Sequence, residues 1–236
     1  MTSIKNRLGG LDWQLIEESL WSTGYALTPA ILTREECSDL VQMYADDSHF
    51  RSRVVMARLG FGKGEYKYFK SPVPKLIFDL REASYPSLAP VANRWAKELG
   101  EAEAFPAKYS DFLRTCHSAG QSKPTPLLLK YEPGDFNCLH QDLYGDIAFP
   151  FQMTFFLSRR VEDYTGGEFV LVEQRPRMQS RATVITAEQG QAVIFHTRYR
   201  AVRGSRGVYR TNLRHGVSPL HSGRRFTLGI IFHDAK

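Results

Sequence analysis

The second half of the chain is a succession of short apolar runs, and this pattern limits the fold more than any other feature. From Thr125 onward, β-branched and aromatic residues alternate with clusters of Gly, Pro, Asn, Asp and Ser at intervals of roughly ten to fifteen residues. Strands of this length and spacing indicate a β-sandwich or barrel. We predict strands at residues 125–131, 151–157, 167–173, 182–187, 190–195, 207–217 and 224–233.

The first half predicts a helical layer. Apolar residues recur at helical spacing between residues 11 and 21, and Thr33 with Glu36 forms a capping box that begins a helix running to about Ala45. Further helices are predicted at residues 74–81, 88–99 and 109–117. No flexible linker separates the halves, so we expect one α+β domain over residues 1–236, with mainly helical support and short strands in 1–124 and a β core in 125–236.

The composition of the 236 residues, 42% hydrophobic and 24% charged, is that of a globular domain with a substantial core. The longest apolar runs, such as residues 153–157, are far too short to span a membrane, and no secretory signal is visible. The odd number of widely spaced cysteines (Cys37, Cys116 and Cys138) suits reduced thiols, so a cytoplasmic protein is expected.

The positive charge is concentrated near the end of the sequence. The chain carries a net charge of +6, but the last 66 residues alone hold twelve Lys or Arg against three acids, a local balance of +9. This excess predicts an anionic partner, whether a carboxylate, a phosphate or a nucleic-acid backbone. A solvated surface is the simpler explanation of such a run.

The segment YEPGDFNCLHQDLYGD, residues 131–146, predicts a metal site. On an extended chain, His140 and Asp142 point to one face, as two ligands of a single ion require. His215 is the preferred third ligand, and His196 remains an alternative. Two histidines and one carboxylate on one face are typical of non-haem Fe(II) oxygenases.

His215 is preferred because a turn and a strand follow it. Arg225 and Thr227 share one face of that strand, and an arginine inside a barrel requires an anion, so the sequence predicts a carboxylate-bearing ligand there. Arg224 would replace Arg225 if the register shifted by one residue.

The sequence resembles the Fe(II)/2-oxoglutarate-dependent dioxygenases over most of its length. The resemblance rests on Y-x-P-G-D-F-N-x-L-H-x-D, QMTFFLS, GGEFVL, G-Q-A-V-I-F and H-G-V-x-P-L-x-x-G-x-R-x-T, in that order. It implies a double-stranded β-helix, that is, a cupin-like jelly-roll, with supporting N-terminal helices. It also implies an enzyme that uses Fe(II), 2-oxoglutarate and O2, and that couples oxidative decarboxylation of 2-oxoglutarate to hydroxylation or oxidative demethylation of a substrate.

The resemblance also implies a role for each site residue. His140, Asp142 and His215 are expected to be the iron ligands, and Arg225 with Thr227 is expected to bind the distal carboxylate of 2-oxoglutarate. Tyr131, nine residues before His140, is expected to reach the same cosubstrate, although it could be a packing residue. Cys138 is expected to be a small buried filler. Phe155 and Phe156 occupy a strand where prolyl-hydroxylase-like relatives favour a tyrosine, which leaves the details of the cosubstrate pocket open.

Within the superfamily, the sequence is most similar to uncharacterised bacterial oxygenases proposed to modify nucleic acid. Leu139–Asp142 also resembles the iron motif of AlkB-type demethylases, but the end of the chain lacks their R-x-N-x-T-x-R pattern. Two basic, aromatic segments could contact a nucleic acid, Arg198–Arg214 beside the third ligand and Lys63–Lys70 as a lid over a base. Both could instead be charged edge strands.

Three other functions fit parts of the pattern. They are a prolyl-hydroxylase-like protein or small-molecule hydroxylase, a cupin-like metal-binding module without oxygenase activity, and a basic nucleic-acid-binding β-domain.

Overall fold

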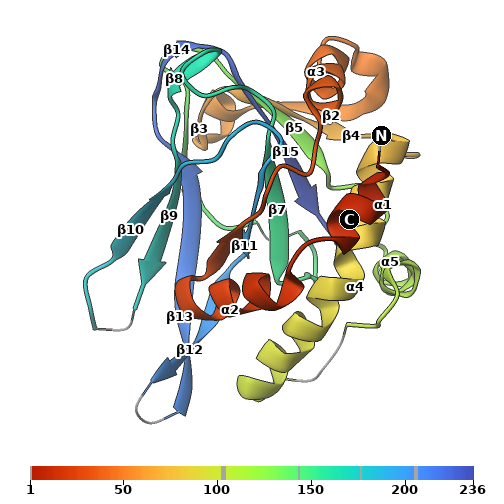
Figure 1. Cartoon of the computed structure of the whole chain (residues 1–236), viewed down its shortest axis with the longest axis vertical. Coiled ribbons are helices and arrows are strands. Elements are labelled where there is room, and N and C mark those ends of the chain that lie inside the picture. Colours follow the sequence, from red (N-terminus) through yellow and green to blue (C-terminus); the bar gives the residue numbers. More distant parts are fainter. Residues whose placement is uncertain (1, 102–104, 143, 176, 205–206) are drawn as a thin grey trace.

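A computed structural model describes residues 2–101, 105–142, 144–175, 177–204 and 207–236. Its core is two antiparallel sheets facing one another, with helices on the outer face of one of them (Figure 1). The helices are α1 (Ile4–Gly9), α2 (Trp13–Thr23), α3 (Arg34–Met43), α4 (Lys75–Glu98) and α5 (Tyr109–Ser118), with 3-10 turns η1 (Asp47–His49) and η2 (Met56–Leu59).

The larger sheet has seven strands in the order β1-β11-β7-β15-β5-β4-β2. Its strands are β1 (Tyr25–Leu27), β2 (Phe50–Val55), β4 (Glu65–Phe69), β5 (Leu127–Tyr131), β7 (Phe151–Phe156), β11 (Ala192–His196) and β15 (Arg225–Ile231). The side chains of β15 alternate between two environments. Phe226, Leu228 and Ile230 pack into the hydrophobic cluster shared with the helices, whereas Arg225 and Thr227 line the cavity between the sheets.

The smaller sheet has the order β10-β9-β13-β6-β3, with β12 paired to the free length of β13. Its strands are β3 (Gly62–Lys63), β6 (Phe136–His140), β9 (Phe169–Gln174), β10 (Arg181–Ile185), β12 (Tyr199–Gly204) and β13 (Gly207–Val217). A separate ribbon joins β8 (Tyr164–Gly166) to β14 (Leu220–Gly223). This arrangement confirms the predicted α+β jelly-roll, and every predicted strand of the second half is present.

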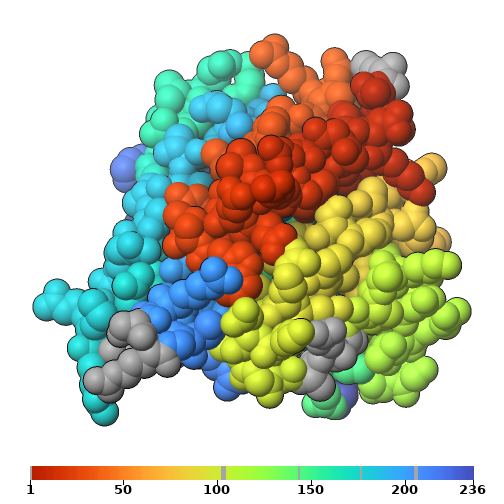
Figure 2. Space-filling model, turned by 60° about the horizontal axis from the view of Figure 1, so that its bottom comes forward, coloured from red at the N-terminus to blue at the C-terminus, as the bar shows by residue number. Residues whose placement is uncertain are grey.

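Both halves of the chain build the sheets. β1, β2 and β4 belong to the larger sheet and β3 to the smaller one, although all four precede residue 125. The N-terminal half therefore completes the β core as well as covering it. Figure 2 shows the covering side, where the N-terminal helices (red) lie between the blue β12–β13 hairpin and the yellow helix α4.

The prediction of two helices at 74–81 and 88–99 was wrong, since α4 runs unbroken from Lys75 to Glu98 and contains Pro86 and Pro90. A proline removes one main-chain hydrogen bond and usually kinks a helix. Here the helix continues because a long face of it is buried against the sheet, including Tyr85, Leu88 and Trp95. The capping box of Thr33 and Glu36 is confirmed at the start of α3. No helix in the described part of the chain is long and apolar enough to cross a membrane.

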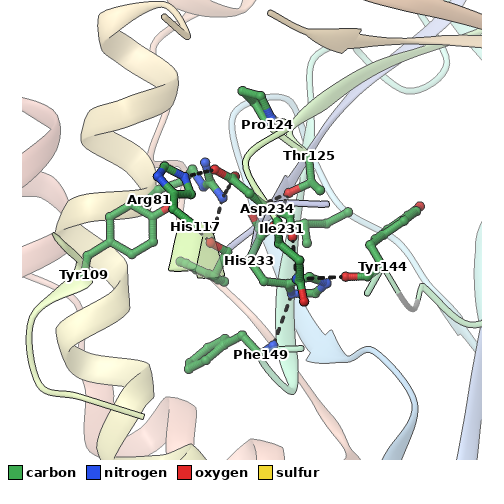
Figure 3. A network of polar contacts seen from close by, with 12 residues as sticks. Arg81, Tyr109, His117, Pro124, Thr125, Tyr144, Phe149, Ile231, His233 and Asp234 are labelled. Atoms are coloured by element: carbon green, nitrogen blue, oxygen red, sulfur yellow. Dashed lines mark hydrogen bonds and ion pairs between the residues drawn. The ribbon is translucent and has the colours of Figure 1, made fainter. Parts of the chain in front are cut away.

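A buried polar network ties the helical layer to the end of the chain (Figure 3). Arg81 on α4 donates to the Asp234 carboxylate at 2.9 Å and to the Phe232 carbonyl at 2.6 Å. Both partners of this ion pair are about 95% buried, with 4% and 5% of their side chains exposed. His117 on α5 meets the second oxygen of Asp234 at 2.9 Å.

We expect Arg81→Met to lower the free energy of unfolding by about 3 kcal/mol, because it leaves the Asp234 carboxylate buried without its cation. Urea denaturation followed by circular dichroism measures the change. Arg114→Met is the matched control, since Arg114 forms a mostly exposed pair with Asp111 and should change stability by less than about 1 kcal/mol. Equal changes in the free energy of unfolding would show that the buried pair stabilises the protein no more than the exposed pair does.

Candidate active site

A cavity of about 350 Å³ lies between the two sheets, within the size range of small-molecule sites. The larger sheet contributes side chains from β4, β5, β7 and β15, and the smaller sheet contributes β6, β9 and β13. The segment that follows β6 closes one side with Gln141, Asp142 and Tyr144. All six residues predicted to bind metal or cosubstrate line this cavity: Tyr131, His140, Asp142, His215, Arg225 and Thr227.

Three potential metal ligands converge on one point of the cavity. His140 ends β6 and is the cross-strand partner of His215 on β13, and Asp142 follows two residues later. Each residue offers a ligand atom within 4.8 Å of the other two. His140 Nε2 lies 3.5 Å from Asp142 Oδ1, and His215 Nε2 lies 3.2 Å from Asp142 Oδ2. Two imidazoles and one carboxylate in this arrangement can hold a divalent iron and leave positions free for ligands.

Neighbouring groups fix the orientation of both imidazoles. His140 Nδ1 lies 2.8 Å from the Cys138 carbonyl, so its N–H donates there and leaves Nε2 facing the cluster. The ring of His215 is stacked against Phe169, with centroids 5.9 Å apart, and meets Phe195 edge-on at 4.8 Å. The geometry of the cluster is therefore held by packing on β9 and β11 as well as by contacts among the three potential ligands.

The electrostatics of the cluster favour a cation. Burial acts to raise the pKa of the Asp142 carboxyl group, but His215 and His140 more than offset it, so the pKa lies well below its ordinary value. Burial, together with the charge of His140, lowers the pKa of His215. An ionised carboxylate and a neutral imidazole are the forms that bind metal.

A chain of tyrosines supports Asp142, and the sequence reasoning missed it. The Tyr144 hydroxyl donates to Asp142 Oδ1 at 3.0 Å, and the Tyr68 hydroxyl donates to Tyr144 at 3.0 Å. The Gln121 side chain holds the main chain of this segment, donating to the carbonyls of Tyr144 at 3.2 Å and Asp234 at 2.7 Å. The available signal was the spacing of Tyr144 two residues after Asp142, which repeats the spacing of Asp142 after His140.

The buried guanidinium of Arg225 lines the cavity. Arg225 is 1% exposed, and none of its three guanidinium nitrogens has a hydrogen-bond acceptor among the described residues. Its guanidinium carbon lies 5.4 Å from the ring centroids of both Tyr131 and Phe156. The Tyr131 hydroxyl is also buried and lacks a partner in the described parts of the chain. A buried guanidinium is costly unless it meets an anion, so this end of the cavity suits a carboxylate.

The alternatives considered for these positions lie elsewhere. His196 is 1% exposed and stacked on Trp95 with centroids 3.7 Å apart, outside the metal-ligand cluster. Arg224 is exposed, whereas Arg225 is the cross-strand partner of Tyr131 and faces the cavity. Of the two phenylalanines, Phe156 packs against Arg225 and Phe155 belongs to the cluster shared with the helices. Cys138 is exposed, so the expectation of a buried filler was wrong; a bulge in β6 displaces it.

The predicted lid at Lys63–Lys70 was also wrong. β4 is an internal strand, paired with β2 on one side and β5 on the other, so its main chain cannot open like a lid. Lys67 is buried on the outer face, where its ammonium group lies 2.6 Å from Asp47. Only Tyr66 of the aromatic residues in this segment lines the cavity, and Lys63 stays exposed on β3.

The basic segment Arg198–Arg214 forms the hairpin β12–β13, of which residues 205–206 lie outside the described part. Arg200 is buried 3.4 Å from Glu173, and Tyr199 and Arg210 bind Glu101. Two arginines and one tyrosine of this segment are thus engaged within the protein. Arg198, Arg203 and Arg214 remain exposed.

Two facing antiparallel sheets enclose the metal-ligand cluster and Arg225 in one cavity. Solved structures share the fold. A prolyl-4-hydroxylase of Pseudomonas putida aligns with a TM-score of 0.55 and 15% identity over 95% of this chain and 99% of that chain. A 2OG-Fe(II) oxygenase family oxidoreductase of Burkholderia pseudomallei aligns with a TM-score of 0.55 and 13% identity over 94% and 92% of the two chains. At such identities the likeness concerns the fold alone.

The sequence comparisons are more specific. Residues 64–235 match the Oxygenase-NA family, described as an oxygenase catalysing oxidative methylation of damaged DNA. Uncharacterized proteins of Mycobacterium tuberculosis, from strains CDC 1551 / Oshkosh and H37Rv, are 49% identical over 167 residues, 71% of this chain and 72% of theirs. The chain belongs to the Oxygenase-NA family.

We expect Arg225→Met to raise the free energy of unfolding of the ligand-free protein by about 2 kcal/mol, because it removes a buried charge that has no partner. Arg200→Met is the matched control. Arg200 is equally buried but lies 3.4 Å from Glu173 and donates to the Trp21 carbonyl, so its loss should destabilise the protein. Urea denaturation measures both, and a similar loss of stability in the two variants would contradict the assignment of Arg225 as unpartnered.

Proposed function

We propose that His140, Asp142 and His215 bind Fe(II), and that Arg225, assisted by Thr227 and Tyr131, binds the distal carboxylate of 2-oxoglutarate. The observation that carries the proposal is the buried, unpartnered guanidinium of Arg225 at the end of the cavity that holds the metal-ligand cluster. Its planar donor fork matches a carboxylate. A diacid held there could reach the two histidines and the aspartate with its other end, since all these residues line one cavity.

When bound, iron and 2-oxoglutarate supply the oxidation of a substrate C–H bond by O2, with decarboxylation of 2-oxoglutarate to succinate and CO2. The residues of the chain perform the binding and orientation. Asp142 presents an ionised carboxylate, His215 presents a neutral imidazole, and Arg225 fixes the cosubstrate at one end. The rings of Tyr131, Phe156 and Phe169 exclude water around these groups.

We infer that the substrate is a nucleic acid, with damaged DNA as the first candidate. The family description names damaged DNA, and the last 66 residues carry a charge balance of +9. The exposed Arg198 and Arg214 lie beside the ligand segment, because the Gln141 amide donates to the main-chain carbonyls of Arg198 and Leu213. Phosphates of a strand entering the cavity would meet these arginines first.

The cysteines support a reducing compartment. All three are free thiols, two of them buried in the core and Cys138 exposed next to the ligand segment. We propose that the protein works in the cytoplasm, where such thiols stay reduced.

The direct test is succinate release by Fe(II)-loaded protein supplied with 2-oxoglutarate and O2. We expect turnover to rise several-fold when alkylated single-stranded DNA is added, and not with undamaged DNA. Asp142→Ala should abolish both metal binding and turnover. His196→Phe is the control, since His196 packs between aromatic rings away from the cluster and should retain activity. Turnover that survives Asp142→Ala would overturn the metal site.

We expect Tyr144→Phe to weaken Fe(II) binding about 10–100-fold, because the Tyr144 hydroxyl orients the Asp142 carboxylate. Anaerobic titration calorimetry measures the affinity. Tyr199→Phe is the control, as it removes a hydroxyl that donates to Glu101 at the surface. Unchanged iron affinity in Tyr144→Phe would show that the carboxylate does not need this hydrogen bond.

A further inference from the structure

Besides Arg225 and Tyr131, the cavity holds another buried polar group that lacks a partner among the described residues. Gln152 lies on β7, is 3% exposed, and its amide nitrogen has no hydrogen-bond acceptor in the ranges that the structure describes. It lines the cavity together with Thr154. Buried amide groups are almost always hydrogen-bonded in proteins, so an amide left unpaired in a cavity indicates a ligand.

Gln152 lies outside the proposed cosubstrate site. The alternation of β7 places Gln152, Thr154 and Phe156 on one face, and it is Phe156 that packs against Arg225. Phe156 follows Gln152 by four residues of strand, a distance of about 14 Å at roughly 3.4 Å per residue. Gln152 is also the cross-strand partner of Phe195, whose ring contacts His215. The amide therefore lies near the metal-ligand cluster, on the side away from Arg225.

Apolar side chains of β5 line the cavity near this end. Leu127 and Leu129 of β5 form one wall. Gly229 adds no side chain to this space, and a Cβ at that position would come within 2.7 Å of Leu127 Cδ2. Phe61 lines the cavity beside β6 and is 47% exposed, so its ring lies at the mouth. Its main chain is fixed to β6 by the bond from the Cys138 N–H to the Phe61 carbonyl, at 2.8 Å.

We propose that this end of the cavity binds an unstacked nucleobase, with the Gln152 amide donating to an acceptor on the base edge and Phe61 stacking on a base at the mouth. The inference rests on the proposed nucleic-acid function and names the residues that read the substrate. A planar ring between apolar walls, fixed by one amide, is how proteins hold a base taken out of its stack. An exposed, rigidly held aromatic ring is how they stack on single strands.

The test separates cosubstrate binding from base recognition in Fe(II)-loaded protein. One arm measures 2-oxoglutarate affinity anaerobically. The other measures binding and succinate release with single-stranded DNA oligonucleotides that each carry one alkylated base. Gln152→Leu should keep the 2-oxoglutarate dissociation constant within about twofold and reduce oligonucleotide-dependent turnover at least about tenfold, the effect of one lost hydrogen bond. Phe61→Leu should weaken oligonucleotide binding by a similar factor.

Two controls keep the result interpretable. Gln152→Leu replaces an unpaired buried amide with an apolar side chain, so its melting temperature should not fall, and any loss of turnover is not a loss of folding. Gln174→Leu removes an exposed amide from β9 and should leave both arms unchanged.

Each remaining outcome overturns the inference in a distinct way. A Gln152→Leu variant that loses 2-oxoglutarate affinity would assign Gln152 to the cosubstrate. A variant that oxidises DNA like the wild type would exclude it from recognition. Wild-type protein that responds to peptides and to no oligonucleotide would refute the nucleic-acid function and, with it, the nucleobase site.

Discussion

The pairing of β6 with β13 is the constraint on which the candidate site depends. It sets His140 opposite His215 on the inner face of the smaller sheet, and a slip of one residue would turn one histidine to solvent. The register changes between His215 and Val217, where a bulge gives β6 an extra residue. Gly216 permits this close approach, because a Cβ there would lie 2.7 Å from the Asn137 carbonyl oxygen. The pairing of these two strands therefore determines where the potential metal ligands meet.

The two faces of the larger sheet have different roles, one in stability and the other in the candidate site. One face of the larger sheet packs against the helices in an apolar cluster. On the other face, Tyr131, Gln152 and Arg225 are buried with polar atoms that no described residue pairs. Such groups oppose folding unless a ligand meets them, so the helical face must supply the compensating stability. Hydrogen bonds also connect the two faces of the sheet. Asp234, held by Arg81 on the helical side, shares the Gln121 side chain with the Tyr144 segment, and Tyr144 supports Asp142.

The sequence predicted the strands of the second half, the three potential metal ligands and the cavity-facing arginine, because each rests on short-range alternation or on a compact motif. Features set by tertiary packing were missed. α4 continues through Pro86 and Pro90 since burial outweighs propensity, and Lys67 is buried because β4 gains strands on both sides. Cys138 is exposed by a bulge that only the pairing of β6 with β13 reveals. In the sequence, Gln152 is one residue of an ordinary strand. Only the folded cavity shows that its amide nitrogen has no hydrogen-bond acceptor among the described residues.

The central claim, that one cavity binds iron at the two histidines and the aspartate and binds 2-oxoglutarate at Arg225, is tested most directly by an anaerobic titration. Fe(II)-loaded protein titrated with 2-oxoglutarate should develop the weak visible charge-transfer band of the iron chelate, saturating with one cosubstrate per chain. In Arg225→Met the same band should require at least about tenfold more 2-oxoglutarate. A wild-type protein that binds Fe(II) without developing the band, or a band that is indifferent to Arg225→Met, would contradict the account.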